Sequence, residues 1–476
     1  KDMWLERLDA VTPPALRWMK NPIRNDYWKS GSVRDDFSTI KAAVLAVGGW
    51  ADGYSNSVMR LLAALSSPSK GLIGPWAHSF PHVAKPGPTI DFIGYAVRWW
   101  DHWLKGIDNR VMEGPRLTCW MQESEQPKAA FETRKGRFVA EARWPFEQQE
   151  IVLHAGENEL AEEPRTLSRK IASRPDLGVG SGEWCPYGWG PDMPLDQRED
   201  DAWSICFDTK PLESAIQILG GVAVRLKLIT FSPEGMVAVR LNEIAADGSS
   251  RRITYGLRNL ALSDDLSSFQ EIAPGQPFGV ELSLNDIAYE VPAGHRLRLS
   301  ISSAYWPLAV GLPEIADLEL RSAEIRIPLR DGSSDLAPQS LGDAQVPAYR
   351  ESRELVKPQR GRLSTARHLD REETVVEVVR NLGAVRLDDV DLTLRALGSE
   401  TYSMPWHQPE RSVARAHRLA GFERENWSVR VETVSRVTFA GQDYRFEGTL
   451  QAFESGEKIF ERKWDETTPR LRARLI

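Results

Sequence analysis

Two side chains that can share a proton follow two strand-like segments near the start of the chain. Asp52 ends the sequence Gly48-Gly49-Trp50-Ala51-Asp52, and His78 ends the sequence Gly74-Pro75-Trp76-Ala77-His78, 26 residues later. A carboxylate beside an imidazole fixes the tautomer of the ring and stabilises the imidazolium that forms in general-base catalysis. The two motifs therefore indicate the acid and the base of a proton-transfer pair.

The segments around this pair alternate between strand and helix. Lys41–Gly49 and Lys70–Trp76 are short apolar runs bounded by glycines, which is typical of buried parallel strands. Residues 56–65 between them have a helical period, with Asn56 as the predicted N-cap. A strand–helix–strand crossover makes both strands parallel, and their carboxyl ends then open on one edge of the sheet. We expect a carboxylate oxygen of Asp52 within about 3.2 Å of an imidazole nitrogen of His78.

The rest of the first 146 residues continues this α/β pattern. Residues 1–33 read as short helices that prolines break. Thr89–Gly106 is an amphipathic helix that Gly106 ends, and Arg116–Met121 is a further strand. Helical periods then give way to alternation, as in Arg296–Ser302. This alternation predicts about eight short strands that form a β-sandwich of the jelly-roll type. Alternation resumes after a Ser-, Gly- and Pro-rich linker over residues 331–348, at residues 373–379, 427–439, 443–453 and 457–464.

The predicted fold class is therefore α/β plus all-β. It consists of the C-terminal portion of an α/β-hydrolase domain, a jelly-roll β-sandwich and a further antiparallel β extension. An acid followed by a histidine, each after a strand, is the chain order of that hydrolase fold. The predicted divisions are 1–33, the short helices; 34–146, the α/β part; 147–345, the sandwich; and 346–476, the extension.

The composition excludes several classes of protein. The chain has 60 basic and 67 acidic residues, a net charge of −7, whereas nucleic-acid binding needs a basic face. No apolar run approaches the roughly 18 residues of a membrane span. Cys119, Cys185 and Cys206 are scattered and form no C-x-x-C pair, so we expect no metal site, no cofactor and no disulfide framework. A reducing, cytoplasmic location is the default interpretation.

Several other side chains are weaker candidates. Ser55 and Ser57 follow the acid and open a helix, so neither is expected to be a nucleophile. Gly180-Ser181-Gly182 lies in a glycine-rich loop without the strand–turn–helix context of a nucleophile elbow. His82 and His102 lie near the base, but a metal site needs more ligands in a suitable arrangement. The aromatic-rich loop over residues 178–193 either walls an acyl pocket or is an ordered loop packed by its own aromatic side chains.

The segments VLAVGGWADGYSNSVMRLLAAL and KGLIGPWAHS resemble the family of cocaine esterase and X-prolyl dipeptidyl aminopeptidase, the CocE/NonD hydrolases. In that family the Asp of G-G-W-x-D is the triad acid and the His of G-P-W-x-H is the triad base, which implies these roles for Asp52 and His78. Residues 196–212, 218–228 and 293–307 resemble the family's jelly-roll domain, and residues 460–470 resemble longer members.

The resemblance implies that residues 1–33 are the remnant of a helical cap, and it also implies parts that the 476 residues lack. The family's nucleophile lies in a G-x-S-x-G elbow upstream of its cap helices, and no such elbow is found here. The chain also begins at Lys1 without an initiator Met or a signal pattern. We therefore interpret it as the C-terminal two-thirds of a serine hydrolase, inactive alone and dependent on a missing N-terminal segment of the same protein.

The expected substrates are small acyl esters, amides or short peptides. A homo-oligomer is left open, and neither nucleic acid nor a membrane span is expected. The competing interpretation is a non-catalytic β-sandwich binding module, for instance for carbohydrate. Residues 1–146 argue against it, because a pure binding module has no use for an acid motif and a base motif on successive strands.

Overall fold

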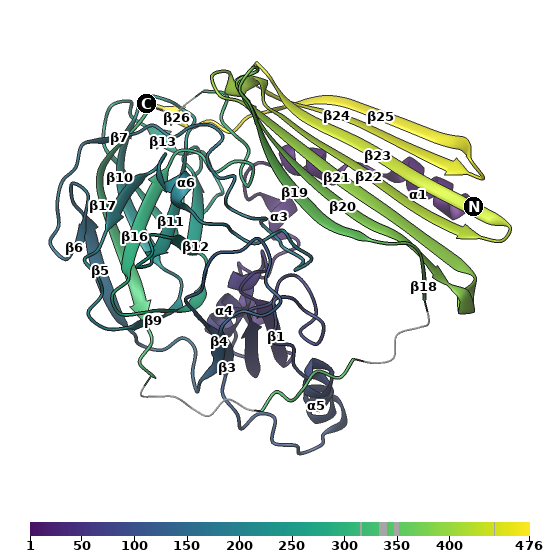
Figure 1. Cartoon of the computed structure of the whole chain (residues 1–476), viewed down its shortest axis with the longest axis horizontal. Coiled ribbons are helices and arrows are strands. Elements are labelled where there is room, and N and C mark those ends of the chain that lie inside the picture. The colour runs from purple at the N-terminus through teal and green to yellow at the C-terminus, as the bar shows by residue number, and fades with distance from the viewer. Residues whose placement is uncertain (315–316, 333–339, 347–351, 442) are drawn as a thin grey trace.

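The structure is a computed structural model that describes residues 1–314, 317–332, 340–346, 352–441 and 443–476. Figure 1 shows a β-sandwich on the left, a small α/β part at the bottom, and a separate sheet of long strands at the upper right. The predicted linker lies partly outside the described residues, at 333–339 and 347–348. The fold is α/β plus all-β, as the sequence predicts.

Short helices precede the first strand, as the proline breaks predict: α1 (Asp2–Ala10), α2 (Pro14–Met19), α3 (Asp26–Lys29) and the 3-10 helix η1 (Phe37–Thr39). α1 packs against the long-stranded sheet. Its buried Leu8 lies in a cluster with Leu450 and Ala452 of the long-stranded sheet. Apolar burial therefore fixes the start of the chain to its end.

The α/β part follows in the predicted order: β1 (Val44–Gly49), α4 (Ser55–Ala64), β2 (Ser69–Gly74), α5 (Phe92–Lys105) and β3 (Leu117–Glu123). β1 pairs with β2 in parallel over its full length, and β2 pairs in parallel with β3. Val58 and Leu62 of α4 are buried in the cluster that contains Ala46 of β1 and Ile73 of β2. The crossover expected from the sequence is confirmed.

The ends of α5 match the signals in the sequence, whereas the start of α4 does not. Asp91 caps α5 by accepting a hydrogen bond from the Gly94 N–H at 2.9 Å, and Gly106 ends it with φ +69°. The prediction that Asn56 caps α4 is wrong, because Tyr54 occupies the N-cap position. The Asn56 side chain instead donates to Asn285 at 2.8 Å and accepts from the Asp286 N–H at 2.8 Å. A tertiary contact has taken the side chain that the local signal assigned to the cap.

One twelve-stranded mixed sheet continues from the α/β part into the sandwich, in the order β1-β2-β3-β15-β9-β17-β10-β14 with β4 to β7 attached. The junction is a short parallel pairing of β15 with β3, in which Tyr289 lies opposite Gln122. Its remaining strands are β4 (Gly136–Glu141), β5 (Gln149–Ala155), β6 (Leu160–Ala161), β7 (Arg169–Ile171), β9 (Ile216–Gly220), β10 (Ala223–Thr230), β14 (Phe278–Ser283), β15 (Ile287–Val291) and β17 (Leu318–Leu329).

A four-stranded antiparallel sheet in the order β12-β11-β16-β8 supplies the second layer of the sandwich. Its strands are β8 (Ile205–Asp208), β11 (Met236–Ile244), β12 (Ser250–Asn259) and β16 (Arg296–Ser302), and α6 (Arg198–Asp201) precedes β8. Leu299 and Leu241 from this sheet and Leu226 and Ile325 from the larger sheet are buried in one core. The alternation in residues 296–302 thus predicted a strand whose apolar face closes the sandwich.

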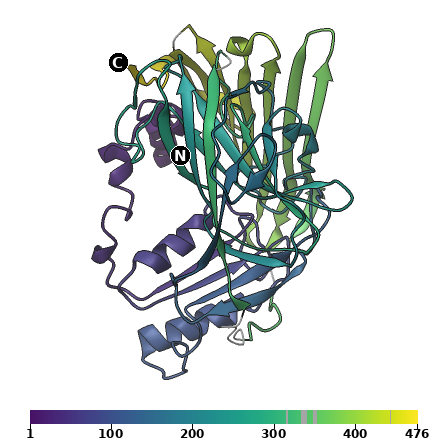
Figure 2. The ribbon, with the colours of Figure 1, turned by 90° about the vertical axis from the view of Figure 1, so that its left-hand side faces the viewer.

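The extension is an eight-stranded antiparallel sheet (Figures 1 and 2): β18 (Arg353–Val356), β19 (Gln359–His368), β20 (Glu373–Leu387), β21 (Leu392–Pro405), β22 (Val413–Arg424), β23 (Trp427–Ala440), β24 (Asp443–Glu454) and β25 (Glu457–Pro469), with 3-10 helices η3 (Asp388–Val390) and η4 (Pro409–Arg411). Trp306 of the sandwich, 4% exposed, packs against Val376 and Met404 of this sheet. The chain then returns to the sandwich, where β26 (Arg474–Leu475) pairs with β13 (Glu271–Ile272). The extension is therefore attached at several points.

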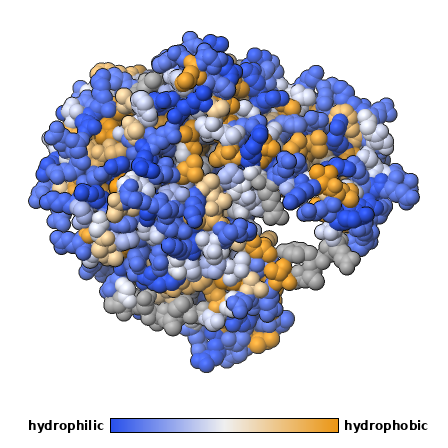
Figure 3. All heavy atoms as spheres, viewed as in Figure 1, coloured by the Kyte–Doolittle hydropathy of each residue, from blue (hydrophilic) through white to orange (hydrophobic). Residues whose placement is uncertain are grey.

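The outer surface is mixed in character. Figure 3 shows hydrophilic side chains over most of one face, with apolar side chains in small separate groups. Among the described residues, no helix is both long enough and apolar enough to cross a membrane.

Candidate active site

The turns after β1 and β2 stay paired beyond the strands themselves. The Trp50 N–H donates to the Gly74 carbonyl at 2.9 Å, and the Ala51 N–H donates to the Trp76 carbonyl at 3.1 Å. Gly49 permits this approach, because a Cβ at that position would lie 2.0 Å from the Trp76 carbonyl oxygen. The two turns therefore run side by side and deliver Asp52 and His78 to the same place.

Asp52 and His78 form a hydrogen-bonded pair. His78 Nδ1 lies 3.0 Å from Asp52 Oδ2, inside the limit predicted from the sequence. The other carboxylate oxygen, Oδ1, accepts the Tyr54 N–H at 2.9 Å, so both oxygens are fixed. The Asp52 side chain is 14% exposed and the His78 side chain is 43% exposed. The geometry of the pair is confirmed, and its catalytic role stays a prediction.

The aromatic loop, residues 178–193, lies directly over this pair. The backbone N–H of His78 donates to the Pro186 carbonyl at 2.8 Å, and the Tyr187 ring meets the imidazole edge-on with centroids 5.4 Å apart. Tyr54 flanks the imidazole at 5.8 Å and also contacts Trp184 of the loop. The loop therefore walls the site rather than packing only on itself.

The β extension holds this loop from the far side. Glu183 of the loop forms an ion pair with Arg380 of β20, and the Arg380 guanidinium lies 5.9 Å from the centre of the Tyr187 ring. Burial raises the pKa of Glu183 to about 7, and Arg380 opposes that shift. A Cβ at Gly361 would lie 2.1 Å from the Gly190 carbonyl oxygen, so the two backbones are in close contact. Sequence reasoning missed these partners, because no local signal links β20 to the loop.

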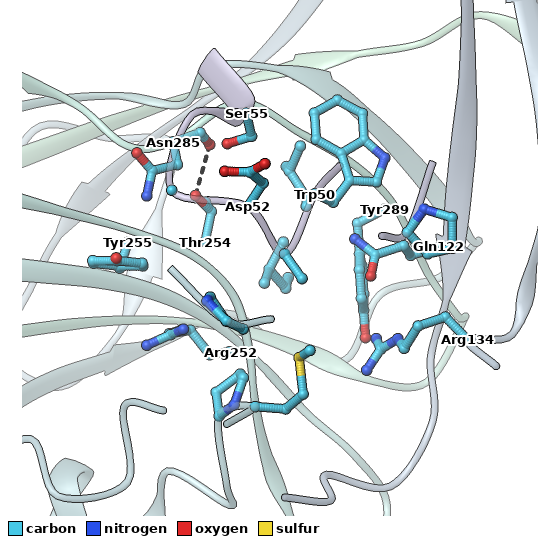
Figure 4. A pocket seen from close by; sticks show the side chains of 18 of the residues that line it. Trp50, Asp52, Ser55, Gln122, Arg134, Arg252, Thr254, Tyr255, Asn285 and Tyr289 are labelled. Carbon is cyan, nitrogen blue, oxygen red and sulfur yellow. Dashed lines mark hydrogen bonds between the residues drawn. The ribbon is translucent and has the colours of Figure 1, made fainter. Parts of the chain in front are cut away.

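A cavity of about 120 Å³ lies beside Asp52, between the α/β part and the sandwich. Figure 4 shows Asp52 and Ser55 at the top of the view and Trp50 at its upper right. Gln122, Arg134 and Tyr289 line the right-hand side. Asp52 thus borders a space that a small molecule can enter.

Fixed polar groups line the far side of this cavity. The Tyr289 hydroxyl donates to the buried Glu243 at 2.5 Å, and Arg134 pairs with Glu125 at 3.1 Å. Burial raises the pKa of Tyr289, and burial lowers that of Arg134 while Glu125 opposes the shift. The wall therefore carries a cation and a hydroxyl in set positions.

The loop also brings a thiol to the pair. One ligand atom each from Asp52, His78 and Cys185 lies within 4.8 Å of the other two. The sequence predicts no metal site, because its cysteines are not closely spaced and these three residues come from separate segments.

The remaining candidates differ in their surroundings. Ser55 is 5% exposed at the start of α4, and Ser181, 1% exposed, donates to the Gly182 carbonyl at 3.0 Å. His82 stacks on Phe92 with ring centroids 6.2 Å apart, and His102 lies on α5.

Two family models match consecutive parts of the chain. Residues 1–80 match the X-Pro dipeptidyl-peptidase (S15 family), and residues 109–335 match the X-Pro dipeptidyl-peptidase C-terminal non-catalytic domain. The first match contains Asp52 and His78, and the second contains the sandwich. The chain belongs to the CocE/NonD hydrolase family.

Curated members of this family share part of their length with the chain. It is 26% identical over 330 residues to the Mycobacterium bovis protein named "Putative serine esterase Mb1866c", covering 63% of this chain and 50% of that protein. It is 19% identical over 316 residues to the cocaine esterase of Rhodococcus sp., covering 60% and 53%. The chain thus spans about half the length of the curated relatives it matches.

A solved structure agrees on the fold. An α-amino acid ester hydrolase superposes with a TM-score of 0.51 at 16% identity, over 68% of this chain and 61% of that one. The CocE/NonD chain therefore combines an α/β-hydrolase part with a β-sandwich.

Proposed function

We propose that this chain supplies the acid and the base of a serine hydrolase that cleaves acyl ester or amide bonds, and that the nucleophilic serine lies outside these 476 residues. The observation that carries the proposal is the 3.0 Å contact between His78 Nδ1 and Asp52 Oδ2 at the ends of adjacent parallel strands. The names of the relatives, a serine esterase and a cocaine esterase, support an ester as substrate.

In this mechanism the serine hydroxyl attacks the substrate carbonyl while His78 accepts its proton through the nitrogen that does not face Asp52. His78 then returns the proton to the leaving alcohol or amine, and the acyl group stays on the serine. Water repeats the sequence, with His78 as base and then as acid, and releases the carboxylic acid. Asp52 keeps the proton on Nδ1 and stabilises the imidazolium in both halves.

The surroundings of the pair support these roles. The Tyr54 N–H holds the Asp52 carboxylate in place, and the Pro186 carbonyl holds the backbone of His78. Asp52 is mostly shielded from water while His78 is half exposed, so the acid is fixed and the base is accessible. The cavity beside Asp52 is proposed to receive part of the substrate.

We further propose the domain organisation in which this site is set. Residues 1–33 are the remnant of a helical cap, 34–146 the α/β part, 147–345 a jelly-roll sandwich and 346–476 the extension. The core between two sheets supports the assignment of residues 147–345 as a sandwich, and the eight-stranded sheet supports that of residues 346–476 as the extension.

The test uses the protein expressed from its complete gene, assayed on simple aryl esters. Asp52→Asn and His78→Gln are expected to lower kcat by roughly 10³–10⁴-fold, because the base loses its orientation or is removed. His102→Gln, which changes an α5 histidine outside the site, is the matched control and should leave kcat unchanged. A fluorophosphonate probe should label a serine outside these 476 residues. Full activity in His78→Gln would refute the proposal and favour the binding-module alternative.

A further inference from the structure

We propose that Asp52, His78 and Cys185 form a binding site for a divalent transition-metal ion of the Zn²⁺ type. The three residues offer a carboxylate oxygen, an imidazole nitrogen and a thiol sulfur, and one such atom of each lies within 4.8 Å of the other two. This set combines the ligand types that zinc prefers in proteins.

The separations suit one ion with small side-chain rotations. Zinc binds its N, O and S ligands at about 2.0–2.3 Å, so the donor atoms of a tetrahedral site lie about 3.3–3.8 Å apart. The Asp52 oxygen and the His78 nitrogen are 3.0 Å apart, and the widest separation among the three atoms is within 4.8 Å. The ion therefore needs the Asp52–His78 pair to open slightly, while the thiol sulfur already lies within 4.8 Å of both partner atoms.

The charges of the site also suit a dication. An ionised Asp52 and a Cys185 thiolate together neutralise a 2+ ion, and the imidazole binds in its neutral form. A bound metal deprotonates a coordinating thiol, so Cys185 would bind as the thiolate. The neighbouring Glu183 is already balanced by Arg380.

The site is both accessible and partly enclosed. The His78 side chain is 43% exposed, which leaves room for water as a fourth ligand. The rings of Tyr54 and Tyr187 flank the imidazole, with centroids 5.8 Å and 5.4 Å away, and shield the site from bulk water. An apolar shell of this kind strengthens the attraction between an ion and its ligands.

Metal binding would withdraw His78 from proton transfer whichever ring nitrogen is bound. In the hydrolase proposed above, the ion is therefore an inhibitor that competes with the Asp52–His78 hydrogen bond. The binding itself does not rest on that proposed function and is measured without any substrate.

Cobalt(II) is the probe, because a thiolate ligand gives it a near-ultraviolet charge-transfer band that carboxylates and imidazoles do not. Titration of the purified protein, expressed from its complete gene, with Co²⁺ is expected to produce this band with one equivalent, and Zn²⁺ should displace it. Cys185→Ser should abolish the band, and Asp52→Asn should weaken Co²⁺ binding at least about tenfold.

Cys206→Ser is the matched control, because Cys206 is a partly exposed thiol whose sulfur lies 3.4 Å from the Ser300 hydroxyl and outside the set. It should leave both the band and the affinity unchanged. Far-ultraviolet circular dichroism establishes that each variant is folded, and Cys185→Ala replaces a Ser variant that is not. Binding of Co²⁺ without the band, or a band that persists in Cys185→Ser, would overturn the proposal.

Discussion

Removing the Arg380 guanidinium should release the aromatic loop from the β extension. Arg380→Ala breaks the ion pair with Glu183 and the contact with the Tyr187 ring. It leaves Glu183 buried without its partner, and burial already raises the pKa of this carboxyl to about 7. The loop should then open more often, because its closed form has lost its attachment to β20.

The free-energy cost of removing Arg380 depends on how deeply the Arg380–Glu183 pair is buried. Breaking a fully buried pair costs about 3–5 kcal/mol, and an exposed pair is worth about 0–1 kcal/mol. The two side chains are 22% and 18% exposed, so we place the cost between these limits, at about 2 kcal/mol. At about 1.4 kcal/mol per factor of ten, loop opening should become roughly 30 times more frequent.

Hydrogen exchange measures this opening directly. The Glu183 N–H donates to the Asp192 carbonyl at 2.9 Å, and the Tyr187 and Gly188 N–H groups donate to the Asp192 carboxylate at 3.1 and 2.9 Å. These amides should exchange roughly 30-fold faster in Arg380→Ala, since exchange follows local opening.

Arg445→Ala is the matched control. Arg445 pairs with Asp465 in the same sheet, but the two side chains are 42% and 60% exposed. Its loss should leave the loop amides protected, because an exposed ion pair contributes little to stability. Equal loop exchange in the two variants would show that Arg380 does not hold the loop.

Two further substitutions test the surroundings of the site. Burial raises the pKa of Asp286 from 3.8 to about 6, so the folded state binds more protons than the unfolded state in that window and stability falls as the pH rises through it. Asp286→Asn should therefore stabilise the protein by as much as roughly 3 kcal/mol above pH 6 and by little below about pH 4, measured by urea unfolding at both pH values; equal effects at both would contradict this cause. Asp91→Ala removes the cap that accepts the Gly94 N–H and should cost about 1 kcal/mol in the same assay, whereas an unchanged midpoint would show that the cap is dispensable.

The pair at the centre of the site could be predicted because its signals are local. Two apolar runs, a helix between them and the turn motifs after each were enough to place Asp52 beside His78. The alternation in residues 296–302 likewise matches β16. In each case burial on a known face leaves a pattern along the chain.

The strands and contacts that could not be predicted from the sequence depend on pairing between distant segments. The strands over residues 392–405 and 413–424 were not predicted, and few of their residues are fully buried. Cross-strand contacts stabilise them instead, such as His417 with Glu432 at 2.8 Å. The contact of Arg380 with Glu183 and the approach of Cys185 to the pair are of the same kind, since only the folded sheet creates them.

The junction of β3 with β15 has a consequence for how the chain folds. β1, β2 and β3 lie near the start of the sequence, but their sheet continues into β15. Tyr289 of β15 is far along the chain from its partner Gln122 of β3. Parallel pairing across such a distance gives a high contact order, and the entropy of closing the loop must be overcome before the contact stabilises anything. During synthesis the turns that carry Asp52 and His78 emerge long before the strand that completes their sheet, so the site is set late, by the closure of the sandwich.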